Sequence, residues 1–183
     1  MHIHIILGSV RQGRIGPDIG KRIAQAIHQL APAHTCEIVD LVDWPLPMDD
    51  EPALPASGEY QQPHTRRWSE KIRQGEMMIF LFPQYNWGYP AALKNALDHL
   101  YQEWADKPAL IISYANRGGG KAAAQLEQVL TGLHMRPLSE AIPLTLSELG
   151  YAEGKQPHPD TPLPEPYQQQ LARALAEAER LVS

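Results

Sequence analysis

A short basic stretch near the N-terminus carries the side chains whose types and spacing best suit binding chemistry. Residues 8–16 read GSVRQGRIG and place Ser9, Arg11 and Arg14 directly after a hydrophobic run. A serine hydroxyl, two guanidinium groups and free N–H groups at the start of a helix all suit phosphate oxygens. A strand-to-helix turn with two solvated arginines explains the same residues equally well. This stretch alone therefore leaves both interpretations open.

The same loop matches neither of two common nucleotide-binding motifs. Gly8 and Gly13 have the glycine spacing of a Walker loop, but Arg14 and Ile15 stand where Lys and Ser or Thr belong. The GxGxxG pattern of a dinucleotide-binding turn is also missing. A phosphate bound here would need a different arrangement of donors.

The segments around this loop alternate between strand and helix. Apolar runs predict strands at 3–7, 36–42, 77–82, 109–114 and 139–144. Apolar stripes at helical spacing predict helices at 17–30, 64–74, 90–101, 126–133 and 171–182. This alternation predicts an α/β fold with a parallel sheet and helices on both faces. With 183 residues, we expect one domain over 1–183, with a proline-rich loop at about 43–63 and a C-terminal extension at about 151–183.

Composition narrows the class of protein. The net charge of −5 is not the basic footprint of a nucleic-acid-binding protein. No apolar run approaches the length of a membrane-spanning helix, and the first residues do not resemble a secretory signal. A single cysteine, Cys36, cannot form an internal disulfide, so we expect a cytoplasmic protein with neither nucleic-acid nor membrane partners.

Two further loops stand out because of their unusual residue types. PQYNWGYP (83–90) follows the third predicted strand, and SYANRGGG (113–120) overlaps the end of the fourth. In a parallel sheet these loops meet the first one at the same edge, where ligands bind. The aromatic side chains suit a flat ligand, although packing within the loop or a subunit contact is at least as good an explanation for Trp87. Glycines let the backbone approach a ligand closely, but they also serve ordinary tight turns.

Several blocks in these loops resemble the NADPH-dependent FMN reductases, a family that includes azo-dye, quinone and chromate reductases. The blocks are Gly8-Ser9-x-Arg11, Arg14-x-Gly16, Pro83-x-Tyr85-Asn86, Pro90-Ala91-x-Leu93-Lys94-Asn95-Ala96-x-Asp98, Lys107-Pro108, Ser113-Tyr114 and Gly118-Gly119. The resemblance implies a flavodoxin-like fold, with a five-stranded parallel sheet in the order 2-1-3-4-5. It also implies bound FMN, NADPH or NADH as the hydride donor, a small-molecule electron acceptor, and a homodimer or homotetramer.

The resemblance further implies which residues bind the cofactor. Ser9 and Arg11 are expected at the phosphate, Pro83 to Trp87 along the ring and ribityl chain, and the third loop on the far side. The full set is Ser9, Arg11, Arg14, Ile15, Gly16, Pro83, Gln84, Tyr85, Asn86, Trp87, Ser113, Tyr114, Gly118 and Gly119. From their charge and position alone, we expect Arg14 or Arg117 to meet the extra phosphate of NADPH. Two departures from the family pattern are Gln84, where many relatives have Glu, and Ala115, where a glycine often follows the tyrosine.

The implied activity is hydride transfer from the nicotinamide to FMN and then to a quinone, azo compound, free flavin or metal-ion acceptor. No protein acid or base is expected to be essential, because the flavin carries the chemistry. Two alternatives use the same fold: a flavin-binding electron carrier or redox-responsive partner-binding protein, and a protein that has lost flavin binding.

Three further groups of residues could in principle bind a metal or react, but each has a simpler structural explanation. His2 and His4 have a spacing on a strand that fits metal ligands, but such a pair more often forms the polar side of an end strand, so no metal is expected. We expect Cys36 to be a small core residue rather than a nucleophile. The acidic run at 49–51 is expected to be solvated.

Overall fold

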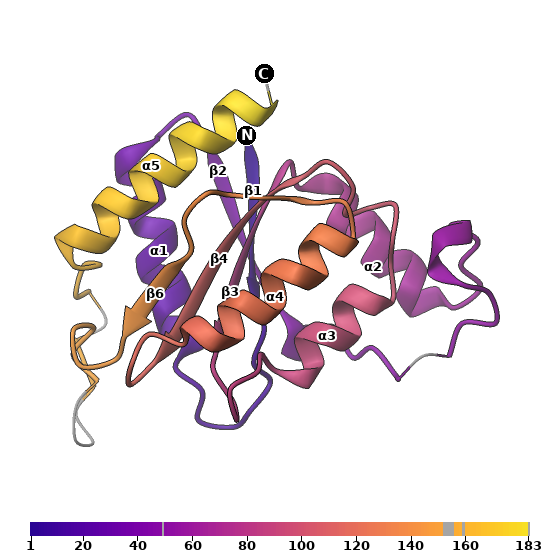
Figure 1. Ribbon diagram of the computed structural model, residues 1–183, viewed down its shortest axis with the longest axis horizontal. Helices are drawn as coiled ribbons and strands as arrows, with labels where there is room; N and C mark the ends of the chain where they lie inside the picture. Colours follow the sequence, from indigo (N-terminus) through magenta and orange to yellow (C-terminus); the bar gives the residue numbers. More distant parts are fainter. Residues whose placement is uncertain (49, 152–155, 159, 183) are drawn as a thin grey trace.

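A parallel sheet covered by helices on both faces organises the chain (Figure 1). The computed structural model describes residues 1–48, 50–151, 156–158 and 160–182. Its strands are β1 (His2–Leu7), β2 (Thr35–Asp40), β3 (Met77–Pro83), β4 (Pro108–Ala115), β5 (Arg136–Pro137) and β6 (Ile142–Thr145). They lie in the order β2-β1-β3-β4-β5, with β6 also paired to β4, and every pairing is parallel. The expected strand order is confirmed.

The outer position beside β4 differs from the expectation of one strand at 139–144. Two short pieces share that position: β5 pairs with Pro108 and Ala109, and β6 pairs with residues 112–115. The N–H of Leu138 still donates to Ala109 O at 3.0 Å, and the chain leaves the ladder after it. Pro137 and Pro143 lack the N–H that a paired strand donates, which is tolerated at a sheet edge. Within the described residues, the sheet therefore has six strands rather than five.

The helices divide between the two faces of the sheet. In Figure 1, α1 (Gly16–Leu30) and α5 (Glu165–Val182) lie on one side, and α2 (Pro63–Gln74), α3 (Ala91–Asp98) and α4 (Gly120–Gly132) lie on the other. Pro17 and Pro63 sit in the first turn of their helices, where the missing N–H costs no hydrogen bond. Single 3-10 turns occur at Leu41–Asp43, at the start of the proline-rich loop, and at Pro55–Ser57, within that loop. The described helices include none with the length and apolar character needed to cross a membrane.

Alternating side chains of the central strands build two hydrophobic cores. Ile79 and Leu81 of β3 pack with α1 and α5, whereas Phe80 and Phe82 pack with α2, α3 and α4. All four side chains are essentially excluded from solvent. This burial on both faces explains why β3 is an unbroken apolar run.

His4 is the polar exception in the middle of β1. Its side chain is 0% exposed and points to the same face of the sheet as Ile6. Burial lowers the pKa of His4 to about 4, so the imidazole is neutral near pH 7. Its Nδ1 is buried and has no hydrogen-bond partner among the residues that the structure describes.

Cys36 on β2 is half-buried and packs against the core that includes α1. Burial raises the pKa of its thiol to about 11. At pH 8 only about one thiol in a thousand is then ionised, and the thiolate is the reactive form. We expect iodoacetamide to alkylate folded Cys36 at least about 100-fold more slowly than a free cysteine at pH 8. Alkylation of the folded protein at the rate seen after denaturation would contradict this.

Candidate functional site

The three unusual loops converge at the carboxyl edge of the sheet. They follow β1, β3 and β4, and the loops after β1 and β3 lie together at the lower edge of Figure 1. Strand order reverses between β1 and β3, because β2 lies on the outer side of β1 and β4 lies beyond β3. Such a reversal opens a crevice between the two loops, which is the usual ligand position in open α/β sheets.

Ser9 joins the first loop to the second. Its side chain is buried, and its hydroxyl lies 2.7 Å from the Tyr85 hydroxyl and accepts a long hydrogen bond, 3.4 Å, from the Arg11 N–H. The Arg11 guanidinium lies over the Tyr85 ring, with Cζ 5.8 Å from the ring centroid. Gly8 before it leaves no room for a side chain, because a Cβ there would lie 3.0 Å from atoms of Phe82 and Leu93. The loop is thus held close to the body of the protein at its start.

The two arginines of the first loop have different surroundings. Arg14 Nη2 lies 2.5 Å from Asp40 Oδ2, so its charge is paired with a carboxylate at the end of β2. Arg14 Nε is buried and has no acceptor within the described part of the chain. Arg11 is exposed and forms no ion pair with any residue that the structure describes. Arg11 is therefore the available cation, and Arg14 offers one unused N–H.

Ile15 and Gly16 begin helix α1 beside this loop. No side chain caps the helix at Ile15, and Gly16 is its first residue. A Cβ at Gly16 would lie 3.1 Å from the Tyr114 hydroxyl, so glycine lets β4 and α1 approach closely. Tyr114 itself is buried in the core, and burial raises the pKa of its phenol. The N–H groups of the first turn of α1 remain available to an anion.

The second loop is a tight two-residue hairpin. Tyr85 N–H donates to Gly88 O at 2.8 Å, and Gly88 N–H donates to Tyr85 O at 2.9 Å. The two central residues, Asn86 and Trp87, have φ of 49° and 72°, the left-handed conformation that a type I′ turn requires. The N–H of Tyr85 is thus already used inside the loop. Asn86 and Trp87 keep their N–H groups free of backbone partners among the described residues.

Trp87 occupies a conformation that is costly for a bulky side chain. Trp87 is 64% exposed, and the Lys121 ammonium lies 2.8 Å from the centroid of its ring. Lys121 belongs to the first turn of α4, so this contact links the second loop to the helix that follows the third loop.

Backbone geometry and two side chains fix the third loop and the helix that follows it. Gly118 and Gly119 have φ of 77° and 80° and are buried. The Ser113 hydroxyl donates to Gly118 O at 2.7 Å, which holds the turn against the end of β4. Gln84 Oε1 accepts a hydrogen bond from Ala122 N–H at 3.2 Å and so caps the start of α4. Gln84 therefore connects the second and third loops.

A groove of about 590 Å³ lies between the first and second loops and the start of α3. Its lining residues are Val10, Arg11, Gln84, Tyr85, Asn86, Pro90, Ala91 and Ala92. A second hollow of about 460 Å³ shares Val10, Ala91 and Ala92 with it and extends to Trp44 and Leu46. Grooves of this size hold cofactors and drug-sized ligands.

The structure brings some of the expected site residues together at the groove and leaves others outside its lining. Of the expected site residues, Arg11, Gln84, Tyr85 and Asn86 line the groove. The others are not among its lining residues: Ser9, Arg14, Ile15, Gly16, Pro83, Trp87, Ser113, Tyr114, Gly118 and Gly119. Asp40, the partner of Arg14, was not among the residues expected from the sequence. Its position at the end of a predicted strand, on the same sheet edge as the loops, was the available signal.

Comparison with known proteins shows the family to which this chain belongs. The model of the family described as NADPH-dependent FMN reductase matches residues 1–146. An NAD(P)H-dependent FMN reductase of Schizosaccharomyces pombe is 48% identical over 146 residues, covering 79% of this chain and 72% of its own. An NADPH:quinone oxidoreductase of Arabidopsis thaliana is 30% identical over 133 residues, with 70% of this chain and 66% of its own covered. Among solved structures, the NAD(P)H:(acceptor) oxidoreductase FerB of Paracoccus denitrificans shares the fold, with a TM-score of 0.72 at 19% identity, covering 98% of this chain and 96% of that one.

The chain belongs to the NADPH-dependent FMN reductase family, a family of oxidoreductases with a flavodoxin-like fold. The resemblance drawn from the loop motifs is therefore confirmed.

Proposed function

We propose that this protein is an NAD(P)H-dependent FMN oxidoreductase that passes electrons to a quinone, azo compound, free flavin or metal-ion acceptor. The observation that carries the proposal is the groove between the first and second loops, with Arg11 in its lining and Ser9 beneath it. Family membership supports the same activity.

The phosphate end of the groove fits FMN. Ser9, the exposed Arg11 guanidinium, the unused Arg14 Nε–H and the first turn of α1 together supply donors and positive potential for an anion. A phosphate monoester carries about −1.5 to −2 charges at neutral pH. Because Asp40 neutralises the Arg14 charge, we assign the main electrostatic contribution to Arg11.

The rest of the groove fits a flat ring. Gln84, Tyr85 and Asn86 form one wall, and Pro90 to Ala92 form an apolar surface beside it. The Asn86 and Trp87 N–H groups are the backbone donors that remain available to the polar edge of a ring. The hairpin holds these amides in place, so they need no rearrangement when a ligand binds.

Bound FMN would supply hydride acceptance and donation, which no amino-acid side chain can provide. The described residues that line the groove include no histidine and no carboxylate. The contribution of the chain is accordingly to orient the ring, supply polar contacts to its edge and leave one face open.

A titration followed by an acceptor panel tests the proposal. FMN added to the flavin-free protein should bind with one molecule per chain. The loaded protein should then oxidise NADPH in the presence of a quinone, an azo dye, free flavin or a metal oxyanion. Bound flavin without NADPH oxidation would instead indicate an electron carrier, and absence of flavin binding would contradict the proposal entirely.

Arg117 is the better candidate for the extra phosphate of NADPH. It is exposed in the third loop, whereas the Arg14 guanidinium is paired with Asp40. We expect Arg117→Ala to raise KM for NADPH about tenfold and to leave KM for NADH within a factor of two, the loss of one charge-assisted contact. Arg14→Ala should change both KM values alike. Steady-state kinetics with both nucleotides measures this, and equal effects of Arg117→Ala on the two would exclude the role.

We also propose that the protein forms a homodimer through the apolar face beside the groove. Val10, Val42 and Met48 line the hollow that adjoins the groove, and Met48 also lines a further hollow with Leu54. Met48 and Leu54 are 82% and 80% exposed. Large exposed apolar patches of this kind usually mark an interaction surface. Sedimentation as a monomer at micromolar concentration would contradict the dimer.

The half-buried thiol of Cys36 is consistent with a reducing compartment such as the cytoplasm.

A further inference from the structure

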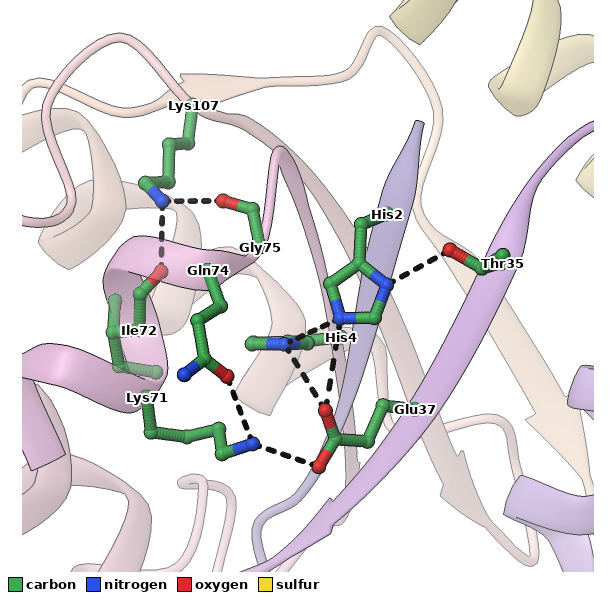
Figure 2. A network of polar contacts seen from close by, with 9 residues as sticks. All are labelled: His2, His4, Thr35, Glu37, Lys71, Ile72, Gln74, Gly75 and Lys107. Atoms are coloured by element: carbon green, nitrogen blue, oxygen red, sulfur yellow. Dashed lines mark hydrogen bonds and ion pairs between the residues drawn. The ribbon is translucent and has the colours of Figure 1, made fainter.

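A second polar cluster lies at the opposite end of the sheet from the groove. It contains His2 and His4 of β1 and Glu37 of β2, and Lys71 of α2 borders it (Figure 2). The parallel register pairs His4 with Glu37, which places the three side chains on one face of the sheet. The C-terminal turn of α2 lies over them (Figure 2).

Three potential ligand atoms converge in this cluster. His2 Nε2 and His4 Nε2 are 3.1 Å apart, and each lies 3.6 Å from Glu37 Oε2. In a tetrahedral zinc site with bonds of about 2.0–2.1 Å, ligand atoms are separated by about 3.3 Å. The three atoms therefore already have nearly the spacing that one ion would impose.

Neighbouring groups orient these ligands in the way that metal sites require. His2 Nδ1 lies 2.8 Å from Thr35 Oγ1, and a hydrogen bond donated by Nδ1–H would leave the Nε2 lone pair free. Glu37 Oε2 faces the two histidines, whereas Oε1 accepts a hydrogen bond from Lys71 Nζ at 2.8 Å, a contact that competes with a metal ion for the carboxylate. No partner among the described residues holds His4 Nδ1, so its ring can place the proton there and free Nε2.

His4 is fully buried in β1, where its neighbours in the strand are isoleucines, and its Nε2 faces the other two side chains of the cluster. The other two side chains remain partly open, with His2 34% and Glu37 41% exposed. An ion could therefore enter and keep water as its fourth ligand.

We propose that His2, His4 and Glu37 form a binding site for a divalent transition-metal ion of the zinc class. Two imidazoles and one carboxylate form a donor set typical of zinc. Ligands from β1 and β2 would cross-link these strands at the edge remote from the groove. The site is independent of the proposed flavin chemistry.

Zinc binding to the FMN-loaded, tag-free protein tests this proposal. After treatment with a chelator and exchange into phosphate-free buffer, calorimetric titration with Zn²⁺ should show one ion per chain. Zn²⁺ at about 100 times its Kd should raise Tm by roughly 5–10 °C. His2→Ala and Glu37→Gln alter partly exposed side chains, so both should fold and should weaken zinc binding at least tenfold. His28→Ala, which removes an exposed histidine of α1, should change nothing.

Lys71 gives a test in the opposite direction. Its ammonium repels a cation at this site, so Lys71→Met should tighten zinc binding, roughly tenfold. A purely structural hydrogen-bond network would gain nothing from this substitution. Weaker zinc binding in Lys71→Met, no binding to the wild type, or unchanged binding in His2→Ala and Glu37→Gln would each overturn the proposal. Loss of binding in His64→Ala alone would place zinc at Asp50, His64 and His99 and would overturn it as well.

Discussion

Ser9→Asp is expected to raise the Kd for FMN by at least about 100-fold and to leave the Kd for riboflavin within about threefold. The substitution puts a carboxylate where we place the phosphate, and two anions about 4 Å apart in a partly buried site repel strongly. Riboflavin lacks the phosphate, so it isolates the contribution of that group. Fluorescence titration of the flavin-free protein with both ligands measures the two constants.

The control for this variant is Ser9→Ala. It removes the hydroxyl but adds no charge, so the Kd for FMN should rise only about tenfold, the value of one hydrogen bond to a charged group. Tm of both variants shows whether loss of the Ser9–Tyr85 hydrogen bond has disturbed the loops. If Ser9→Asp weakened FMN and riboflavin by the same factor, Ser9 would not lie at the phosphate.

Gly118→Ala is expected to lower the free energy of unfolding by about 2–4 kcal/mol. The residue has φ of 77°, and a Cβ there would lie 2.8 Å from Pro143 Cβ and 3.2 Å from the Pro143 carbonyl oxygen. Left-handed backbone strain and a contact that forces β6 to move both contribute. Tm should fall by roughly 5–15 °C, as measured by circular dichroism in parallel with the wild type.

Gly120→Ala provides a matched control two residues away. Gly120 begins α4 with a negative φ, and a Cβ there would meet nothing within 4 Å. Alanine should therefore be neutral or stabilising by up to about 1 kcal/mol. A stability loss in Gly120→Ala as large as that in Gly118→Ala would show that the geometry of the turn is not the cause.

The sequence predicted the fold well because its signals are local. Buried parallel strands such as β3 are continuous apolar runs, and Pro17 and Gly75 mark helix ends. The division of the fifth strand position into β5 and β6 was not predicted. This division depends on which backbone N–H groups near Pro137 and Pro143 pair with β4. Only the tertiary structure determines that pairing.

The candidate site was predicted less completely because its details depend on contacts between distant segments. Ser9 and Tyr85 are far apart in the chain, and their hydroxyl contact connects two loops. Arg14 was expected to be available to a phosphate, but its pairing with Asp40 across the sheet edge leaves Arg11 as the available cation. The type of each loop residue could be read from the sequence, whereas its hydrogen-bond partner could not.

Anaerobic mixing of the FMN-loaded protein with one equivalent of NADPH tests the central claim most directly. If the groove between the first and second loops holds FMN with one face open to a nicotinamide, the flavin absorbance should bleach in a single turnover. It should return when a quinone is added. Flavin that binds but stays oxidised in the presence of NADPH would contradict the proposed activity.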